Sequence, residues 1–470
     1  MNRQRTLRRP CAMIAFLLVG VVFVVLSPSM SAQAQPHTQS LGGLWLTDGY
    51  GELIEFQGDE LRSFEITQMS CLPVGKVMRK SGAGTGKEIE FEEDGDVDRA
   101  MPGSSPKTRW LREDGSVSSI MLRRTGSKPQ VCGRTLADTP MTNYQVFWET
   151  FGENYPFFAL RNMDWRSVDK KFRAQVTPTI KQEELFRILS DMIDPLHDAH
   201  TFINAKSLNK RFRGYRPAPD PMQKKSAARI TDIIEKQYSR EGLRDFCNKQ
   251  LQFGMLSASV GYLRIQSFDS YSDDKEFAKQ LNALENALDS IFKDAAKWTG
   301  LVIDVRINGG GSDVFGISIA SRLANQDYLA YSKVARNDIR NADRRTPPQP
   351  VIVHMSHRPS FRGPVVLLTS ADSVSAAETF TMACLDRQPH IIRMGANTQG
   401  VFSDVLVRKL PNGWSFGLPN EIYLTKDGKA FDGAGVPPDI EVPVFPADDL
   451  ANGHDSALNK ALELLKSKDK

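Results

Sequence analysis

The sequence is poor in the patterns that build metal, redox and nucleotide sites. It holds five cysteines in 470 residues and no C-x-x-C pair, which argues against a cysteine-bound zinc ion or a redox motif. His197 and His200 lack the H-E-x-x-H context of a zinc helix, and no third ligand stands nearby in the sequence. The glycine run 309–311 precedes no Lys-Ser/Thr of a phosphate loop, and Val314 stands where a dinucleotide fingerprint needs its third glycine. We therefore expect neither a metal nor an organic cofactor.

An excess of charge of one sign is also missing. The formal net charge of +4 comes from four arginines within the first ten residues. The other 56 basic residues balance 56 acidic ones, so no basic surface for nucleic acid is indicated. We expect no nucleic-acid partner.

Long apolar runs are absent except for one, from Ala12 to Leu26. It follows the arginines and precedes an A-x-A segment ending at Ala34, which is the pattern of a signal peptide spanning residues 1–34. The alternative is an uncleaved anchor, but the run is short for a membrane span. We expect a periplasmic or extracellular protein with no stable membrane insertion after cleavage. That compartment permits disulfides, and Cys71 and Cys132 are the candidate pair because both lie in the same β-rich region.

The length calls for two or three domains after the leader. Short alternating runs separated by Gly-Asp, Asp-Gly and Ser-Gly turns predict a small antiparallel sheet or barrel over residues 42–135. Within it, residues 82–106 are rich in glycine and charge without a core pattern, and we expect a mobile loop there. Apolar spacing of three to four predicts a helical subdomain at 141–208. The remaining divisions are a linker or helical segment at 209–255, an α/β core at 256–447 and a C-terminal helix at 448–470.

Two apolar runs in the predicted core end in residues that cannot continue a strand. Leu301 to Val305 leads into the glycines 309–311, and the run from Pro364 leads through Ser370 to Ser375 at the start of a helix. Glycines let backbone amides approach a ligand closely, so the pair is typical of a nucleophile facing an oxyanion hole. The alternatives are a tight turn for the glycines and a capping box for Ser375 with Glu378.

The order of these segments and of a third one resembles a known family. The run Asp304 to Gly311, then Ser375-Ala376-Ala377-Glu378, then 433–440 (GAGVPPDI) is similar to the tail-specific (C-terminal processing) and tricorn-core serine peptidases, from about residue 143 to 444. The resemblance implies a crotonase-like α/β core. It also implies Ser375 as nucleophile, with the amides of Gly311 and Ala376 as the oxyanion hole and Gly310 as its neighbour.

The same resemblance points to a histidine base. The processing branch carries a lysine after the glycine of Thr-Phe-Gly-Lys, but this chain has Val401 at that position, and valine cannot accept a proton. The tricorn branch carries an Asp-x-His-Thr motif, which Asp198 to Thr201 match, so His200 is the implied base. The family glutamate that orients the histidine is replaced by Asp432, whose alternative role is an Asp-Gly turn residue. Glu378 and Asp198 are expected to support the catalytic residues.

The predicted function is that of a secreted serine endopeptidase of the C-terminal processing type, without an inserted PDZ domain, which acts on peptide or protein substrates through an acyl-enzyme on Ser375. Two alternatives stay open. One is a catalytically weak or inactive binding protein on the same fold, for an apolar ligand or a peptide. The other is an esterase-type acyl hydrolase using the same site.

Overall fold

The computed structural model describes residues 41–82, 88–217 and 224–467. The expected signal peptide, 1–34, lies outside the described residues. Among the helices of the described part, none combines the length and the apolar character needed to cross a membrane. The unit described below begins at Leu41.

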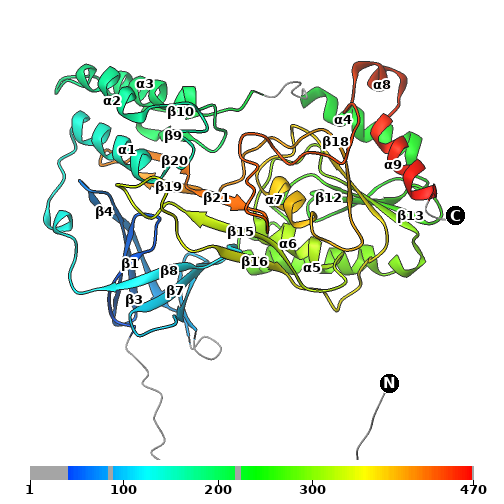
Figure 1. The fold of residues 1–470 in the computed structure, drawn as a ribbon, viewed down its shortest axis with the longest axis horizontal. Coiled ribbons are helices and arrows are strands. Elements are labelled where there is room, and N and C mark those ends of the chain that lie inside the picture. Colours follow the sequence, from blue (N-terminus) through cyan, green and yellow to red (C-terminus); the bar gives the residue numbers. More distant parts are fainter. Residues whose placement is uncertain (1–40, 83–87, 218–223, 468–470) are drawn as a thin grey trace, which may run out of the picture. The chain divides into compact units, whose positions relative to one another are not determined.

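The β-rich region is a closed barrel in which each strand pairs with the next and β8 returns to β1 (Figure 1). All neighbours are antiparallel, as tight turns between successive strands require. Part of its interior is apolar, including Trp45, Ile54 and Phe91. The strands are β1 (Gly43–Thr47), β2 (Glu52–Gln57), β3 (Glu60–Ile66), β4 (Cys71–Lys80), β5 (Ile89–Glu93), β6 (Asp96–Pro102), β7 (Thr108–Glu113) and β8 (Ile120–Thr125).

The prediction of a loop over residues 82–106 was wrong for residues 89–102, and residues 83–87 lie outside the described part. Strands β5 and β6 occupy 89–102, joined by a turn at Asp94 and Gly95, both with positive φ. β6 lacks the alternation of apolar and polar residues that predicts a strand, because Asp96 and Asp98 occupy positions that line the cavity.

A disulfide ties the barrel to the chain that leaves it. Cys71 in β4 is bonded to Cys132 in the 3-10 turn η1 (Gln130–Gly133), the pair that the sequence singled out. Of the free cysteines in the described residues, Cys384 is buried and Cys247 is half-buried.

The predicted helical subdomain packs on a small sheet. Its aromatic and aliphatic stripes, such as Phe147, Phe151 and Leu189, bury against Phe416 and Leu418 of strand β20. The helices are α1 (Pro140–Asn154), α2 (Trp165–Phe172) and α3 (Gln182–Ile193), and the sheet order is β10-β9-β20-β19. The sheet strands are β9 (Phe202–Ala205), β10 (Lys210–Arg213), β19 (Val405–Lys409) and β20 (Ser415–Pro419).

The core is a seven-stranded sheet in the order β11-β12-β13-β14-β17-β18-β22. From β13 onward its pairs are parallel, and β14 and β17 are buried on both faces, which explains their mostly apolar runs. Leu301 and Ile303 of β14 pack on one side with helices α5, α6 and α7, whereas Val302 packs on the other with α4 and α9. The strands are β11 (Arg244–Phe246), β12 (Leu251–Met255), β13 (Val260–Ile265), β14 (Gly300–Asp304), β17 (Val365–Thr369), β18 (Ile392–Gly395) and β22 (Ile440–Glu441).

The helices on this sheet are α4 (Lys224–Ile233), α5 (Phe277–Phe292), α6 (Asp313–Ser321), α7 (Ala376–Ala383), α8 (Ala447–Asn452) and α9 (Ser456–Ser467). A π-helical turn (Ile234–Tyr238) extends α4. A separate three-stranded sheet, β16-β15-β21, consists of β15 (Tyr328–Ala335), β16 (Gln349–Val353) and β21 (Glu421–Leu424).

The core sheet begins earlier in the chain than predicted. β11 and β12 lie inside 209–255, where a linker or helical segment was expected, and they join β13 as antiparallel edge strands. β11 is only three residues long and carries two charges, so it offers too little apolar pattern to be recognised.

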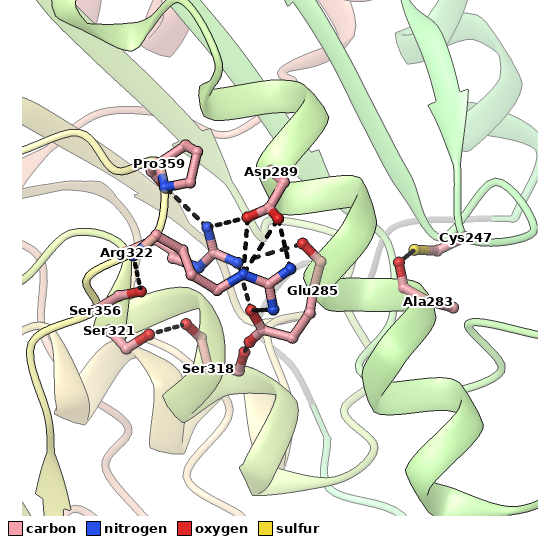
Figure 2. A network of polar contacts seen from close by, with 10 residues as sticks. Cys247, Ala283, Glu285, Asp289, Ser318, Ser321, Arg322, Ser356 and Pro359 are labelled. Atoms are coloured by element: carbon pink, nitrogen blue, oxygen red, sulfur yellow. Dashed lines mark hydrogen bonds and ion pairs between the residues drawn. The ribbon is translucent and has the colours of Figure 1, made fainter.

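A cluster of charged residues fastens the end of α6 to α5 (Figure 2). Arg322 follows α6, is fully buried and pairs with Glu285 and Asp289 of α5. Arg358, from the loop after β16, reaches the same two carboxylates from the exposed side. The pairs hold in place the helix that follows the glycine run.

Candidate active site

The two loops that the sequence singled out lie side by side. β14 and β17 are adjacent and parallel, so both loops leave the same edge of the sheet. Their contact continues beyond the strands: the amide of Val374 donates to the carbonyl of Asn308 at 2.9 Å. The hydroxyl of Ser373 donates to the carbonyl of Val305 at 2.8 Å. The glycine run and Ser375 are therefore held against each other by backbone contacts.

Ser375 has a strained backbone at the amino end of α7. Its φ and ψ are 57° and −119°, in a region that residues with a side chain rarely enter. Such a strained strand-to-helix turn is also how nucleophilic serines are presented in other hydrolases. A Cβ on Gly310 would stand 2.7 Å from the Cβ of Ser375, so only glycine allows this approach. Ser375 is half-buried, and its strained backbone goes beyond what a helix cap requires.

Two backbone amides in these loops are left without a backbone acceptor in the part of the chain that the structure describes. Among the described residues, the amides of Ala376 and Gly311 donate to no backbone acceptor outside regular helices and strands. The amide of Gly310 is already used, since it donates to Asn308 Oδ1 at 2.9 Å. Asn308 in turn donates to the carbonyl of Ile265 at 2.9 Å, which fixes the loop. Gly311 and Ala376 are thus better placed as donors than Gly310.

Glu378 is a buried carboxylate directly beneath Ser375. It accepts the amide of Ser375 at 3.2 Å, the hydroxyl of Thr398 at 2.6 Å, and the amides of Gly400 and Val401 at 2.5 and 2.8 Å. Burial raises its pKa to about 7 in spite of these donors. By accepting the amide of Ser375, Glu378 plays the part of the N3 residue in a capping box. Its other hydrogen bonds join the turn at Ser375 to the segment 398–401.

His200 has a buried ring nitrogen without a partner in the described part of the chain, and burial favours its neutral imidazole form. Burial lowers its pKa below the usual 6.5, while the carboxylates of Asp198 and Asp404 oppose that shift. The carbonyl of Ser403 also favours the protonated ring. Nδ1 is buried and has no partner among the described residues. The backbone amide of His200 donates to Asp198 Oδ1 at 3.0 Å, which fixes the loop around it.

The segment 398–404 connects these groups. Val401 bonds to Glu378 beneath Ser375, whereas Ser403 and Asp404, two and three residues on, act on His200. The segment also contacts the predicted Asp432 loop: the amide of Gly433 donates to the carbonyl of Gly400 at 2.9 Å. Ser375, His200 and the Asp432 loop therefore all adjoin one short segment.

The structure lacks the hydrogen bond expected between Asp432 and His200. Oδ2 of Asp432 and Nδ1 of His200 are both buried without a partner among the described residues. Burial raises the pKa of Asp432 well above its ordinary value, and Glu378 and Asp198 add to the rise. The carboxylates acting on His200 are those of Asp198 and Asp404.

Asp404 and Arg216 are functional candidates that the sequence did not reveal. Asp404 bonds to Lys333 at 2.6 Å and acts on His200. Arg216 has a buried, unpartnered Nη1 in the field of Glu378, Asp198 and Asp432. Neither belongs to a recognisable motif, and a single Asp or Arg in a loop carries no signal of its own.

Comparisons with known proteins agree with this geometry. Residues 259–442 match the model of Peptidase family S41, and residues 137–194 match that of the Tricorn protease C1 domain. Ser375 and Asp432 lie inside the first match, whereas His200 lies between the two. The chain therefore contains a peptidase S41 domain and a tricorn C1 domain.

Individual relatives are more distant. A carboxy-terminal-processing protease of Bartonella bacilliformis is 24% identical over 229 residues, which cover 48% of this chain and 49% of the relative. This chain thus aligns with about half the length of that curated relative. A candidate peptidase from Parabacteroides merdae has a TM-score of 0.60 at 27% identity, covering 70% of this chain and 97% of the other. A point variant of CPAF has a TM-score of 0.50 at 12% identity, covering 70% and 98%, which indicates the fold alone.

Proposed function

We propose that this protein is a serine endopeptidase of the C-terminal processing type, with a crotonase-like core, that cleaves peptide bonds through an acyl-enzyme on Ser375. The observation that carries the proposal is the strained backbone of Ser375 at the amino end of α7, packed against Gly310. A cap requires no positive φ, so the strain needs another reason. The S41 match over the same residues supplies the reaction class.

His200 acts as the base in this proposal. Because burial keeps its imidazole neutral near pH 7, the unpartnered Nδ1 has a lone pair to accept the proton of the Ser375 hydroxyl. The serine oxygen forms a bond to the scissile carbonyl carbon, and the proton then passes to the leaving amine as the C–N bond breaks. Water hydrolyses the acyl-enzyme with the same base.

The charges in the transition state have named partners. The amides of Gly311 and Ala376 stabilise the oxyanion, and each such donor contributes about 3 kcal/mol. The imidazolium that forms on His200 is stabilised by Asp198 and Asp404, both of which favour its protonated form. Asp432 makes no hydrogen bond to His200 in the structure, so its expected orienting role stays a prediction.

We further propose that the protein works in the periplasm or outside the cell. The leader pattern of residues 1–34 and the disulfide between Cys71 and Cys132 support this location, because disulfides persist in oxidising compartments. Peptides or proteins are the proposed substrates, and the S41 match supports that class.

Cleavage of a defined peptide mixture tests the proposal. Wild-type protein should generate new peptide termini detectable by mass spectrometry, and Ser375→Ala and His200→Ala should lower the rate about 10³-fold or more. His197→Ala is the matched control, because this exposed histidine lies three residues away and has no role in the mechanism. Hydrolysis of ester substrates without peptide cleavage would instead support an acyl hydrolase. A folded wild type that cleaves neither would support a binding protein.

A further inference from the structure

The barrel encloses a cavity of about 510 Å³, and residues of β15, β19, β21 and the loops beside them complete its wall. An eight-stranded barrel has room for one small ligand in its interior. Eight of the lining residues are acidic and four are basic. Asp96, the first residue of β6, lines the cavity and is 78% exposed, so the cavity reaches the surface.

One pair of acids inside the barrel already has a cation. Glu52 and Glu65 are directly opposite each other on β2 and β3, where like charges repel. Arg408 of β19 lines the cavity and bonds to Glu52 at 3.0 Å. Burial raises the pKa of Glu65, and the charge of Arg408 opposes that rise. The amide of Lys409 donates to Glu65 at 3.0 Å. A guanidinium group is thus what this wall accommodates.

A second pair of acids is arranged in the same way without such a cation. Asp98 and Glu113 are directly opposite each other on β6 and β7, and both line the cavity. Neither carboxylate has an ion pair or a hydrogen bond among the described residues: Lys76 bonds to Asp96 at 2.6 Å, and Arg408 and Lys333 act on Glu113 through their charges without bonding to it. Burial and mutual repulsion raise the pKa of Asp98 to about 8 and burial raises that of Glu113 to about 7.

An independent feature of the cavity points to an uncharged part of a ligand. Asn420 lines the cavity and is only 3% exposed, yet its Nδ2 has no partner among the described residues. A buried amide without an acceptor is costly, and an incoming carbonyl oxygen would satisfy it.

We propose that the barrel cavity binds an arginine or lysine residue, free or within a peptide, with its cationic head between Asp98 and Glu113 and a carbonyl oxygen on Asn420. The cation of the ligand would serve Asp98 and Glu113 as the guanidinium of Arg408 serves Glu52 and Glu65 within the chain. The site is separate from Ser375, and its occupation does not require catalysis.

Calorimetric titration of the full chain carrying Ser375→Ala tests the proposal and excludes turnover of the probe. Nα-acetylarginine amide should bind, and Nα-acetylcitrulline amide, which has the same shape without the charge, should bind about tenfold more weakly or less well still. n-Butylguanidine, which keeps the guanidinium but lacks the carbonyl and adds no second charge, should lie between them. A pentapeptide with a central arginine that binds more tightly than the amide identifies a polypeptide ligand, whereas weaker binding identifies a free small molecule.

Substitutions locate the binding. Asp98→Asn and Glu113→Gln should each weaken the arginine probe about tenfold or more, and neither should lower the unfolding temperature, because each relieves a repulsion. Glu55→Gln is the matched control, since Glu55 lies on β2 but bonds to Lys128 outside the cavity. Absence of binding, equal binding of the arginine and citrulline probes, or full binding by both cavity variants would overturn the proposal.

Discussion

The backbone of Ser375 is strained, and neighbouring residues hold it in that conformation. Its φ is 57°, and Glu378 holds the turn by accepting the amide of Ser375. Strain of this kind costs about 1–3 kcal/mol and persists only when neighbours enforce it. Gly310 is one such neighbour, because its missing side chain leaves the room that Ser375 occupies.

Gly310→Ala should therefore inactivate the enzyme. The new methyl group would meet Ser375 at 2.7 Å, and the φ of +99° disfavours any side chain. We expect peptide cleavage to fall about 10²-fold, since displacement of a reacting group by about 1 Å costs that much. Gly309→Ala is the control, because a Cβ there meets nothing within 4 Å. Equal rates in the two variants would contradict the packing described.

At this scale the sequence predicted positions better than contacts. Ser375 and Gly311 could be placed because each follows an apolar strand whose end is visible in the chain. The carboxylate that acts on His200 could not be predicted, because it depends on the side-chain rotamers of His200 and of Asp198, Asp404 and Asp432. Arg216 was missed because its role depends on tertiary packing and not on any local pattern.

At the scale of elements, β5 and β6 show where pattern reading fails. A strand of a closed barrel whose interior is partly a polar cavity has acids at inward positions, so it reads as a loop. β14 and β17, by contrast, are covered on both faces and were visible as apolar runs. Burial on both faces leaves a signature in the sequence, and burial against a cavity does not.

The acids of β6 and β7 should make the barrel sensitive to pH. The pKa of Asp98 is about 8 in the folded protein and about 4 in an unfolded chain, so the folded state binds the extra proton. Stability from this group is complete below about pH 4 and is lost as the pH rises to about 8. In Asp98→Asn the free energy of unfolding, measured by chemical denaturation at several pH values, should fall less than in wild type between about pH 4 and pH 8. Plots of this free energy against pH that run parallel for wild type and variant would contradict the prediction.

The cluster at the end of α6 should depend mainly on its buried member. Arg322→Ala removes a buried guanidinium from Glu285 and Asp289, which are 20% and 36% exposed and keep Arg358, and should lower the free energy of unfolding by about 2 kcal/mol. Arg358→Ala removes an arginine that is 43% exposed from the same carboxylates and should cost at most about 1 kcal/mol. Urea denaturation compares the two, and similar losses would show that burial does not decide the contribution.

At the scale of the whole molecule, the disulfide fixes the barrel to the start of the helical region. It closes a loop with a sequence separation of 61 between Cys71 and Cys132. Replacing both by alanine should lower the free energy of unfolding by about 4 kcal/mol through the entropy of the unfolded chain. Cys247→Ser is the control, because this thiol is free. An unchanged unfolding midpoint under reducing conditions would show that the bond contributes nothing.

The central claim is that Ser375 is a nucleophile activated by His200. The most direct measurement is reaction of the folded protein with a fluorophosphonate probe, followed by mass-spectrometric mapping of the adduct. The account predicts one adduct on Ser375 in wild type and in His197→Ala, no adduct in Ser375→Ala, and a rate lower by about 10²-fold or more in His200→Ala. An unlabelled wild type, an adduct on another serine, or unimpaired labelling of His200→Ala would contradict it.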